Sequence, residues 1–127
     1  MLLKKSNLLH NKTIQICGSK SISNRLLILH SLFRNIKIEN ISDAQDTFLL
    51  QQALEGEKDV IDVHHAGTAM RFLTAYFAQK EGRNVVLTGS ERMLQRPIKD
   101  LVEALLALGA NIQYLGVEGY PPLKITG

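Results

Sequence analysis

Hydrophobic positions along the chain follow two periods in turn, one typical of strands and one typical of helices. In Thr13–Cys17 apolar and polar residues alternate, which indicates a strand with one buried face. In Ser21–Phe33 the apolar residues recur every three or four positions, which predicts a helix. Because further apolar residues surround that stripe, we expect this helix to be buried on most sides.

The same alternation continues to the last residue and predicts the remaining elements. Gly89–Arg96 is polar and is expected to be a loop. Pro97 suits the first turn of a helix, and Gly109 suits the position just after its end. The other predicted helices are Asp43–Leu54 and Thr68–Gln79, and the other predicted strands are Ile36–Glu39, Val60–His64, Asn84–Thr88, Asn111–Leu115 and Leu123–Thr126. Helix–strand runs begin at Gly18 and again at Gly67, so we expect an α/β fold built from repeated units.

Composition narrows the class of protein. With 127 residues, 45% of them hydrophobic and 21% charged, the chain has the make-up of one globular domain. No apolar run is long enough for a membrane span, and the first residues do not form a secretory signal, so a cytoplasmic protein is the default expectation. The net charge of +3 is mild, and tryptophan is absent, which argues against nucleic acid as the partner.

A metal site is not expected either. The one cysteine, Cys17, excludes an intramolecular disulfide and a cysteine cluster, and its place in an alternating stretch predicts a buried strand thiol. The four histidines show no metal-ligand spacing. His64 and His65 are adjacent, so on a strand they would point to opposite faces.

Gly18–Arg25, with the sequence Gly-Ser-Lys-Ser-Ile-Ser-Asn-Arg, is the most informative stretch. A glycine permits a tight turn, serines cap the following helix, and the free N–H groups at a helix start favour an anion. Lys20 adds an ammonium group. Arg25 lies one turn after Ser21, so both side chains are suited to the same phosphate or carboxylate. An ordinary helix cap with solvated basic residues is the alternative reading.

Two later stretches repeat this theme. In Ala66–Arg71, Gly67 would let a ligand approach the backbone, Thr68 suits the N-cap position, and Arg71 follows one turn later. In Leu87–Ile98, Arg92 and Arg96 stand between a predicted strand and a predicted helix. The alternative for the first stretch is a purely structural helix cap. The alternative for the second is a solvated surface loop. If the strands before the motifs run parallel, the three motifs converge on one anion site.

Together the three stretches resemble, in order and spacing, the successive signatures of the 5-enolpyruvylshikimate-3-phosphate synthases, and Tyr120–Leu123 resembles a fourth. The resemblance implies a two-domain enzyme that is roughly three times longer and whose domains consist of repeated βαβαββ units. About two of the three units of one domain would be present. On this reading the chain is an N-terminal fragment, expected to be inactive alone, with residues 1–17 as a hinge strand, residues 18–66 as the first unit and residues 67–127 as the second.

The resemblance also implies an activity and site residues. Enzymes of this family transfer the enolpyruvyl group of phosphoenolpyruvate to shikimate 3-phosphate, release phosphate, and use no metal or organic cofactor. Carried onto this chain, Lys20, Ser21 and Arg25 would bind shikimate 3-phosphate, and Lys20 would also lie near phosphoenolpyruvate. Gly67 and Arg96 would bind phosphoenolpyruvate, and Thr68 is a further expected substrate-binding residue. Lys20 is the one candidate catalytic residue, since the main acid and base of the family lie beyond the last residue.

Two positions depart from the family pattern, and two other functions compete. His65 replaces the usual asparagine and Phe72 the usual proline, which affects the expected shape around Gly67. The related UDP-N-acetylglucosamine enolpyruvyl transferases typically carry a reactive cysteine in the loop that corresponds to Gly89–Arg96, and this loop has none. A stand-alone phosphate- or RNA-binding module is the other alternative. If one repeat is missing, apolar faces of the helices at Ser21–Phe33 and Thr68–Gln79 stay uncovered, so we expect self-association as a dimer.

Overall fold

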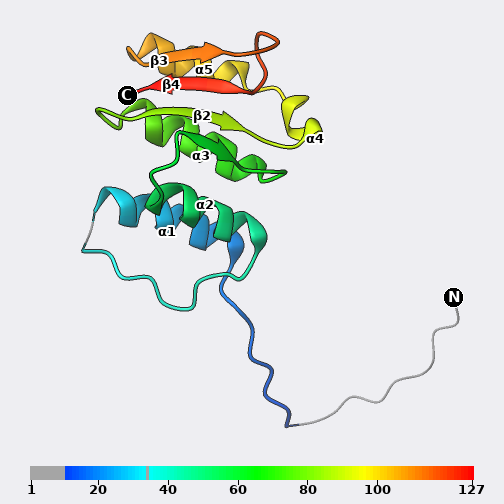
Figure 1. Cartoon of the computed structure of the whole chain (residues 1–127). Coiled ribbons are helices and arrows are strands. Elements are labelled where there is room, and N and C mark those ends of the chain that lie inside the picture. The colour runs from blue at the N-terminus through cyan, green and yellow to red at the C-terminus, as the bar shows by residue number, and fades with distance from the viewer. Residues whose placement is uncertain (1–10, 34) are drawn as a thin grey trace, which may run out of the picture.

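The fold combines five helices with a four-stranded sheet in the part of the chain that the structure, a computed structural model, describes: residues 11–33 and 35–127 (Figure 1). None of these helices is long and apolar enough to cross a membrane. The helices are α1 (Lys20–Leu32), α2 (Gln45–Glu55), α3 (Gly67–Ala78), α4 (Glu91–Leu94) and α5 (Lys99–Ala107), and the strands are β1 (Val60–Asp62), β2 (Asn84–Thr88), β3 (Asn111–Tyr114) and β4 (Leu123–Thr126).

The sheet is mixed, with the strand order β1-β2-β4-β3. Strands β1 and β2 are parallel and are joined through α3, whereas β4 runs antiparallel to both of its neighbours. Apart from the short α4, the elements from β1 onward follow the order βαβαββ. The expected α/β class is therefore confirmed, and the boundaries of the repeated units stay a prediction.

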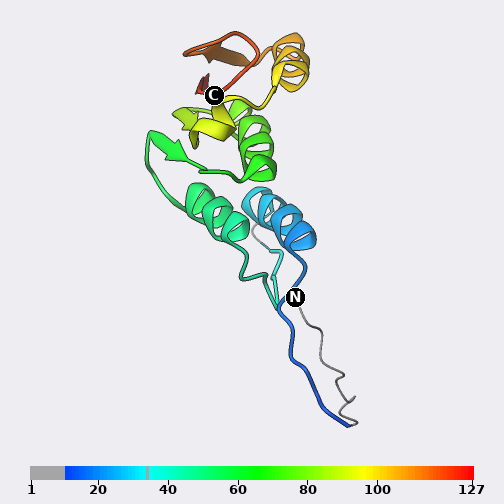
Figure 2. The same cartoon turned by 90° about the vertical axis from the view of Figure 1, so that its right-hand side faces the viewer.

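Helix α3 lies at the centre of the molecule. It packs against β2 and β4 on one side, against α1 and α2 on another, and against α5 (Figures 1 and 2). Its apolar residues recur at helical spacing, so Leu73 and Phe77 are buried together. Strand β2 alternates, and its Val85 and Leu87 point into the same core. Because α3 packs against all of these elements, the position of its first turn relative to them is fixed.

Helices α1, α2, α3 and α5 all begin at the same end of the molecule (Figure 1). The carboxyl ends of β1 and β2 lie at this end too, because α3 returns antiparallel to the two strands that it joins. Figure 2 looks at this end and shows α1, α2 and α3 side by side. Four sets of helix N–H groups and positive dipole ends therefore point in one direction.

Two expected strands are absent from the described residues. Thr13–Cys17 and Ile36–Glu39 are irregular, and Ile14 and Ile16 are 82% and 75% exposed. A strand needs a neighbouring strand that pairs with its backbone N–H and C=O groups. Neither segment pairs with another strand among the described residues. The prediction of a buried Cys17 is wrong for the same reason, since its thiol is exposed. The rest of the expected hinge strand, residues 1–10, lies outside the described residues.

The helices agree with expectation except in three details. The segment expected as a polar loop contains α4, and α5 begins at Lys99, two residues after Pro97. Gly109 has a φ of 93° just after α5, as its predicted role requires. Burial of α1 on most sides is the wrong prediction: Ile22 is 61% exposed and Phe33 is 55% exposed. Among the described residues α1 packs against α2, α3 and the segment that leads to α2, and the rest of its surface is exposed.

The central position of α3 leads to a test of the fold. Leu73 has no exposed surface, so Leu73→Ala removes buried methyl groups and leaves a cavity, at a cost of about 2–5 kcal/mol in the free energy of unfolding. Leu108→Ala makes the same chemical change at a residue that is 84% exposed, and should cost no more than about 0.5 kcal/mol. Denaturant titration followed by circular dichroism measures both. Equal losses would contradict this core.

Candidate anion-binding site

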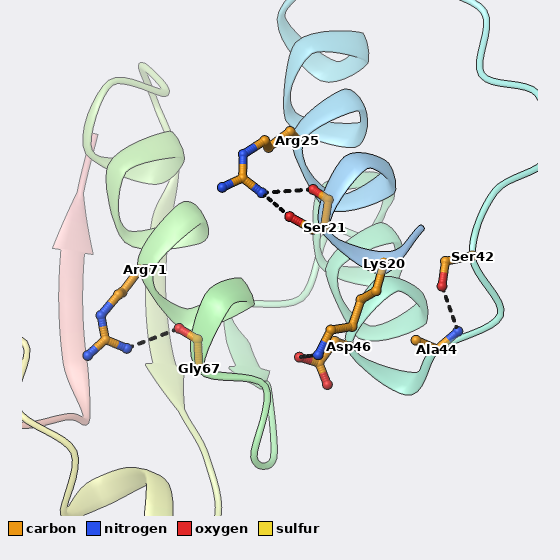
Figure 3. A network of polar contacts seen from close by, with 8 residues as sticks. All are labelled: Lys20, Ser21, Arg25, Ser42, Ala44, Asp46, Gly67 and Arg71. Atoms are coloured by element: carbon orange, nitrogen blue, oxygen red, sulfur yellow. Dashed lines mark hydrogen bonds and ion pairs between the residues drawn. The ribbon is translucent and has the colours of Figure 1, made fainter. Parts of the chain in front are cut away.

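The first part of the site is the start of α1. Gly18 lies so close to the backbone carbonyl of Asn40 that any side chain there would overlap it, which explains the glycine. Ser19 occupies the N-cap position, although its side chain makes no capping hydrogen bond. Lys20 follows, and its Nζ lies 3.3 Å from Oδ2 of Asp46 in the first turn of α2 (Figure 3). This ion pair joins the starts of the two helices.

Ser21 and Arg25 form a unit on α1. The Arg25 guanidinium donates through Nη1 to Ser21 Oγ at 2.6 Å and to the Ser21 carbonyl at 2.9 Å. It also lies over the ring of Phe72 on α3, with 5.8 Å between Cζ and the ring centroid. Figure 3 shows Arg25 reaching from α1 toward α3. The two contacts hold a cation between the two helices.

Buried polar groups fasten α1 to the segment before α2. Ser23 is 4% exposed, and its Oγ accepts a hydrogen bond of 2.9 Å from the N–H of Ser42. The Ser42 hydroxyl in turn accepts from the N–H of Ala44, the N-cap residue of α2 (Figure 3). Ser23 of the first motif therefore stabilises the arrangement of the two helix starts.

The second part of the site joins Gly67 and Arg96. A methyl group placed on Gly67 would lie 2.8 Å from Arg96 Cζ and 3.1 Å from Arg96 Nη2. The Arg96 guanidinium therefore lies against the bare backbone at the start of α3, a position that only glycine leaves open. Two residues that are 29 positions apart in the sequence, and that belong to different motifs, meet here. The Arg96 guanidinium thus lies at the start of α3, where the helix dipole is positive.

The free amides at the start of α3 are those of Thr68 and Ala69. The N–H of Gly67 donates to the His65 carbonyl at 2.9 Å, and that of Met70 closes the first helical turn on Ala66. Among the described residues neither Thr68 nor Ala69 has a backbone acceptor for its N–H. Thr68 is exposed and lies inside the helix, so its predicted N-cap role is wrong and Ala66 holds that place.

Arg71 connects the two segments that form the second part. From the first turn of α3 its Nη1 donates to the Gly67 carbonyl at 3.2 Å, as Figure 3 shows. Its Nη2 donates to the Pro97 carbonyl at 2.8 Å, directly after Arg96. Both terminal nitrogens of this guanidinium are thus engaged with backbone oxygens.

The arginines near the helix starts have no carboxylate partner among the described residues. Within residues 11–33 and 35–127, no carboxylate forms an ion pair with Arg25, Arg71, Arg92 or Arg96, and Lys20 has only Asp46. In the same residues, no three His, Cys, Asp or Glu side chains are grouped as a metal site would need. Unpaired arginines at helix starts favour an anionic ligand.

Two pKa shifts are clear, one at the start of α5 and one on β3. The hydrogen bond and charge of Glu118, followed by the charge of Glu103, raise the pKa of Lys99 above its ordinary value. Burial raises the pKa of the Tyr114 phenol. Lys99 Nζ lies 3.0 Å from Glu118 Oε1, so it connects the start of α5 with the segment between β3 and β4.

The structure brings the predicted site residues together in two groups. Lys20, Ser21 and Arg25 share the first turns of α1, and Gly67, Thr68 and Arg96 meet at the start of α3. Two partners were missed: Asp46, which pairs with Lys20, and Phe72, on which Arg25 stacks. An acidic residue in the first turn of a predicted helix was the available signal for Asp46. No signal in the sequence pointed to the contact between Phe72 and Arg25.

These features define an α/β domain in which arginines lie close to the starts of several helices. The family follows from comparison: the model of the EPSP synthase family, described as 3-phosphoshikimate 1-carboxyvinyltransferase, matches residues 48–127. The chain therefore belongs to the EPSP synthase family.

Known relatives agree with this assignment. A 3-phosphoshikimate 1-carboxyvinyltransferase from Bacteroides fragilis is 53% identical over 116 residues, which cover 91% of this chain and 28% of the relative. One from Cupriavidus necator is 40% identical over 139 residues, covering 91% and 32%. The solved EPSP synthase of Acinetobacter baumannii has the same fold, with a TM-score of 0.72 at 24% identity over 90% of this chain and 31% of that one. The chain spans about a third of the length of these proteins.

The contact between Gly67 and Arg96 leads to a prediction. Gly67→Ala places a methyl group where the Arg96 guanidinium lies, so Arg96 must move and the affinity for inorganic phosphate should fall about tenfold. The fold should persist, since alanine is a better helix former than glycine. Amide shifts titrated with phosphate measure the affinity. In the control, Gly116→Ala, the new methyl would lie 3.7 Å from its nearest neighbour, Pro122, and should leave the affinity unchanged. An unchanged affinity in Gly67→Ala would contradict this site.

Proposed function

We propose that this chain forms the anion-binding part of an enzyme that transfers the enolpyruvyl group of phosphoenolpyruvate to shikimate 3-phosphate and releases phosphate. The relatives that cover most of the chain carry the name 3-phosphoshikimate 1-carboxyvinyltransferase. The single observation that supports the proposal best is the Arg96 guanidinium lying on Gly67 at the start of α3. That arrangement suits a small, multiply charged anion such as phosphoenolpyruvate.

Each group of residues has a role in this proposal. Lys20, Ser21 and Arg25 bind the phosphate of shikimate 3-phosphate at the start of α1, where the guanidinium is already oriented by Ser21 and Phe72. The Asp46 partner keeps Lys20 close to that position.

Gly67, Thr68 and Arg96 bind phosphoenolpyruvate, with the free amides of Thr68 and Ala69 as additional donors. The family resemblance implies that Lys20 also lies near this ligand. Fixed positive charge around the two substrates favours the transition state, in which negative charge develops on the departing phosphate.

Turnover by this chain alone is not expected. The chain covers 28% to 32% of the relatives that carry the activity, and acid, base and anion-binding groups act as a unit. A cytoplasmic location belongs to the same proposal, on the grounds of the family resemblance.

Binding is the property to test. We expect shikimate 3-phosphate to bind with a dissociation constant on the order of millimolar, because only part of the contacts are present. The largest amide shifts should fall on Gly18–Arg25, with those for phosphoenolpyruvate on Gly67, Thr68 and Arg96. Arg25→Lys should weaken shikimate 3-phosphate binding, since a point charge replaces a planar fork. Shikimate without the phosphate is the control ligand and should cause no comparable shifts. Shifts concentrated away from these residues would sink the assignment.

We also propose that the chain self-associates through the faces of α1 and α3. A groove of about 400 Å³ between the two helices is lined mainly by apolar side chains, among them Ile28, Leu29 and Phe72. Leu29 in the groove is 41% exposed, and Leu32, which is on the same helix, is 43% exposed. Burying each large side chain of this kind contributes about 1.5–3 kcal/mol, which favours a two-fold contact between copies.

The mass in solution tests this second proposal. Light scattering over a concentration series should give a dimer at high micromolar concentration. Leu29→Glu places a charge in the groove and should give a monomer. Leu108→Glu makes the same change at a residue outside the groove that is 84% exposed, and should leave the dimer intact. A monomeric parent chain, or equal behaviour of the two variants, would rule out a dimer through this face.

A further inference from the structure

Arg96 depends on its surroundings for its position. Its side chain forms no hydrogen bond or ion pair with another described residue, and the residue is exposed. A long arginine side chain with no partner is free to adopt many rotamers. The guanidinium nevertheless lies against Gly67. The position of the backbone that carries Arg96 therefore decides whether the guanidinium reaches the start of α3.

Hydrogen bonds on both sides of Arg96 hold this backbone. On the upstream side the Arg96 N–H donates to the Met93 carbonyl at 3.0 Å, and the Met93 side chain is buried. On the downstream side the Pro97 carbonyl accepts from Arg71 at 2.8 Å. The upstream bond is local. The downstream bond is the one that ties the segment to α3.

One guanidinium spans both parts of the contact. Arg71 donates to the Gly67 carbonyl at 3.2 Å and, through its other terminal nitrogen, to the Pro97 carbonyl. These carbonyls belong to the residue under the Arg96 guanidinium and to the residue that follows Arg96. A planar fork fixes the separation of two acceptors, which the single ammonium of a lysine does not.

We propose that Arg71 is a positioning residue: it sets the distance between Gly67 and Arg96, so that Arg96 faces an anion at the start of α3. Arg71 is half-buried with both terminal nitrogens engaged, so it acts through Arg96 rather than on the ligand. The identity of that anion as phosphoenolpyruvate rests on the proposed function, whereas the effect of Arg71 on Arg96 does not.

The chain offers a matched control in Arg83. Its Nη1 donates to the Glu57 carbonyl at 3.2 Å and its Nη2 to the Lys58 carbonyl at 3.1 Å. Like Arg71, Arg83 engages both terminal nitrogens with backbone carbonyls, although its two acceptors are adjacent residues of one segment. It directly precedes β2, whereas the segment with Arg96 follows the opposite end of that strand. Replacing either arginine should therefore lower the stability of the fold. Only the replacement of Arg71 should affect Arg96.

The experiment compares Arg71→Lys with Arg83→Lys in the whole 127-residue chain. Without ligand, the side-chain Nε–H signal of Arg96 reports its order through the heteronuclear NOE. We expect this NOE to fall in Arg71→Lys alone. With phosphoenolpyruvate as the probe, Arg71→Lys should lose about tenfold in affinity, while Arg83→Lys stays within about twofold of the parent. If Arg71→Lys does not fold, Arg71→Gln and Arg83→Gln provide the same comparison.

Each result has a distinct meaning. An unchanged Arg96 NOE in Arg71→Lys, or equal losses of affinity in both variants, would overturn the positioning role. A titration in which the Arg71 side chain shifts more than that of Arg96 would make Arg71 a binding residue and would overturn it as well. If phosphoenolpyruvate causes no shifts at Gly67 and Arg96 in the parent chain, the proposed function fails, and the NOE still decides the role of Arg71.

Discussion

The parallel pairing of β1 with β2 is the constraint on which the arrangement of the site depends. Two parallel strands need a crossover that returns the chain to its starting end, and α3 provides it. The start of α3 must then lie at the carboxyl ends of both strands, and the segment that leaves β2 must pass close to it. The approach of Arg96 to Gly67 follows from this topology. It requires a glycine, because a Cβ would occupy the space of the guanidinium.

When several helices begin at one end of a molecule, their positive dipole ends repel one another. In this chain the compensating negative charge differs from one helix start to the next. At α1 and α2 the carboxylate of Asp46 balances Lys20. At α3 and α5 the described residues provide no such partner for Arg96, and Arg71 is occupied by backbone carbonyls, which carry only partial charge. An anion would relieve the second imbalance more than the first. The start of α3 is therefore a favourable place for an anion.

Periodicity predicted the well-packed elements and failed where an element lacks a neighbour. Leu73 and Phe77 on α3, and Val85 and Leu87 on β2, are buried as their spacing indicates. Ile14 and Ile16 alternate just as regularly, yet they are exposed, because strand pattern alone provides no partner for the backbone. The family resemblance assigned Gly67 and Arg96 to one ligand, but it did not predict that the two residues touch. Their contact, and the bridge that Arg71 makes across it, depend on three-dimensional distances that spacing in the sequence does not encode.

We propose that a small anion binds between the start of α3 and Arg96. A crystal structure of the chain grown with phosphoenolpyruvate is the decisive measurement. Ligand density is expected within hydrogen-bond distance of the Thr68 amide and the Arg96 guanidinium, with Arg71 still joined to the carbonyls of Gly67 and Pro97. Density at another place on the surface, with the Arg96 guanidinium still lying on Gly67 and without a ligand, would contradict it.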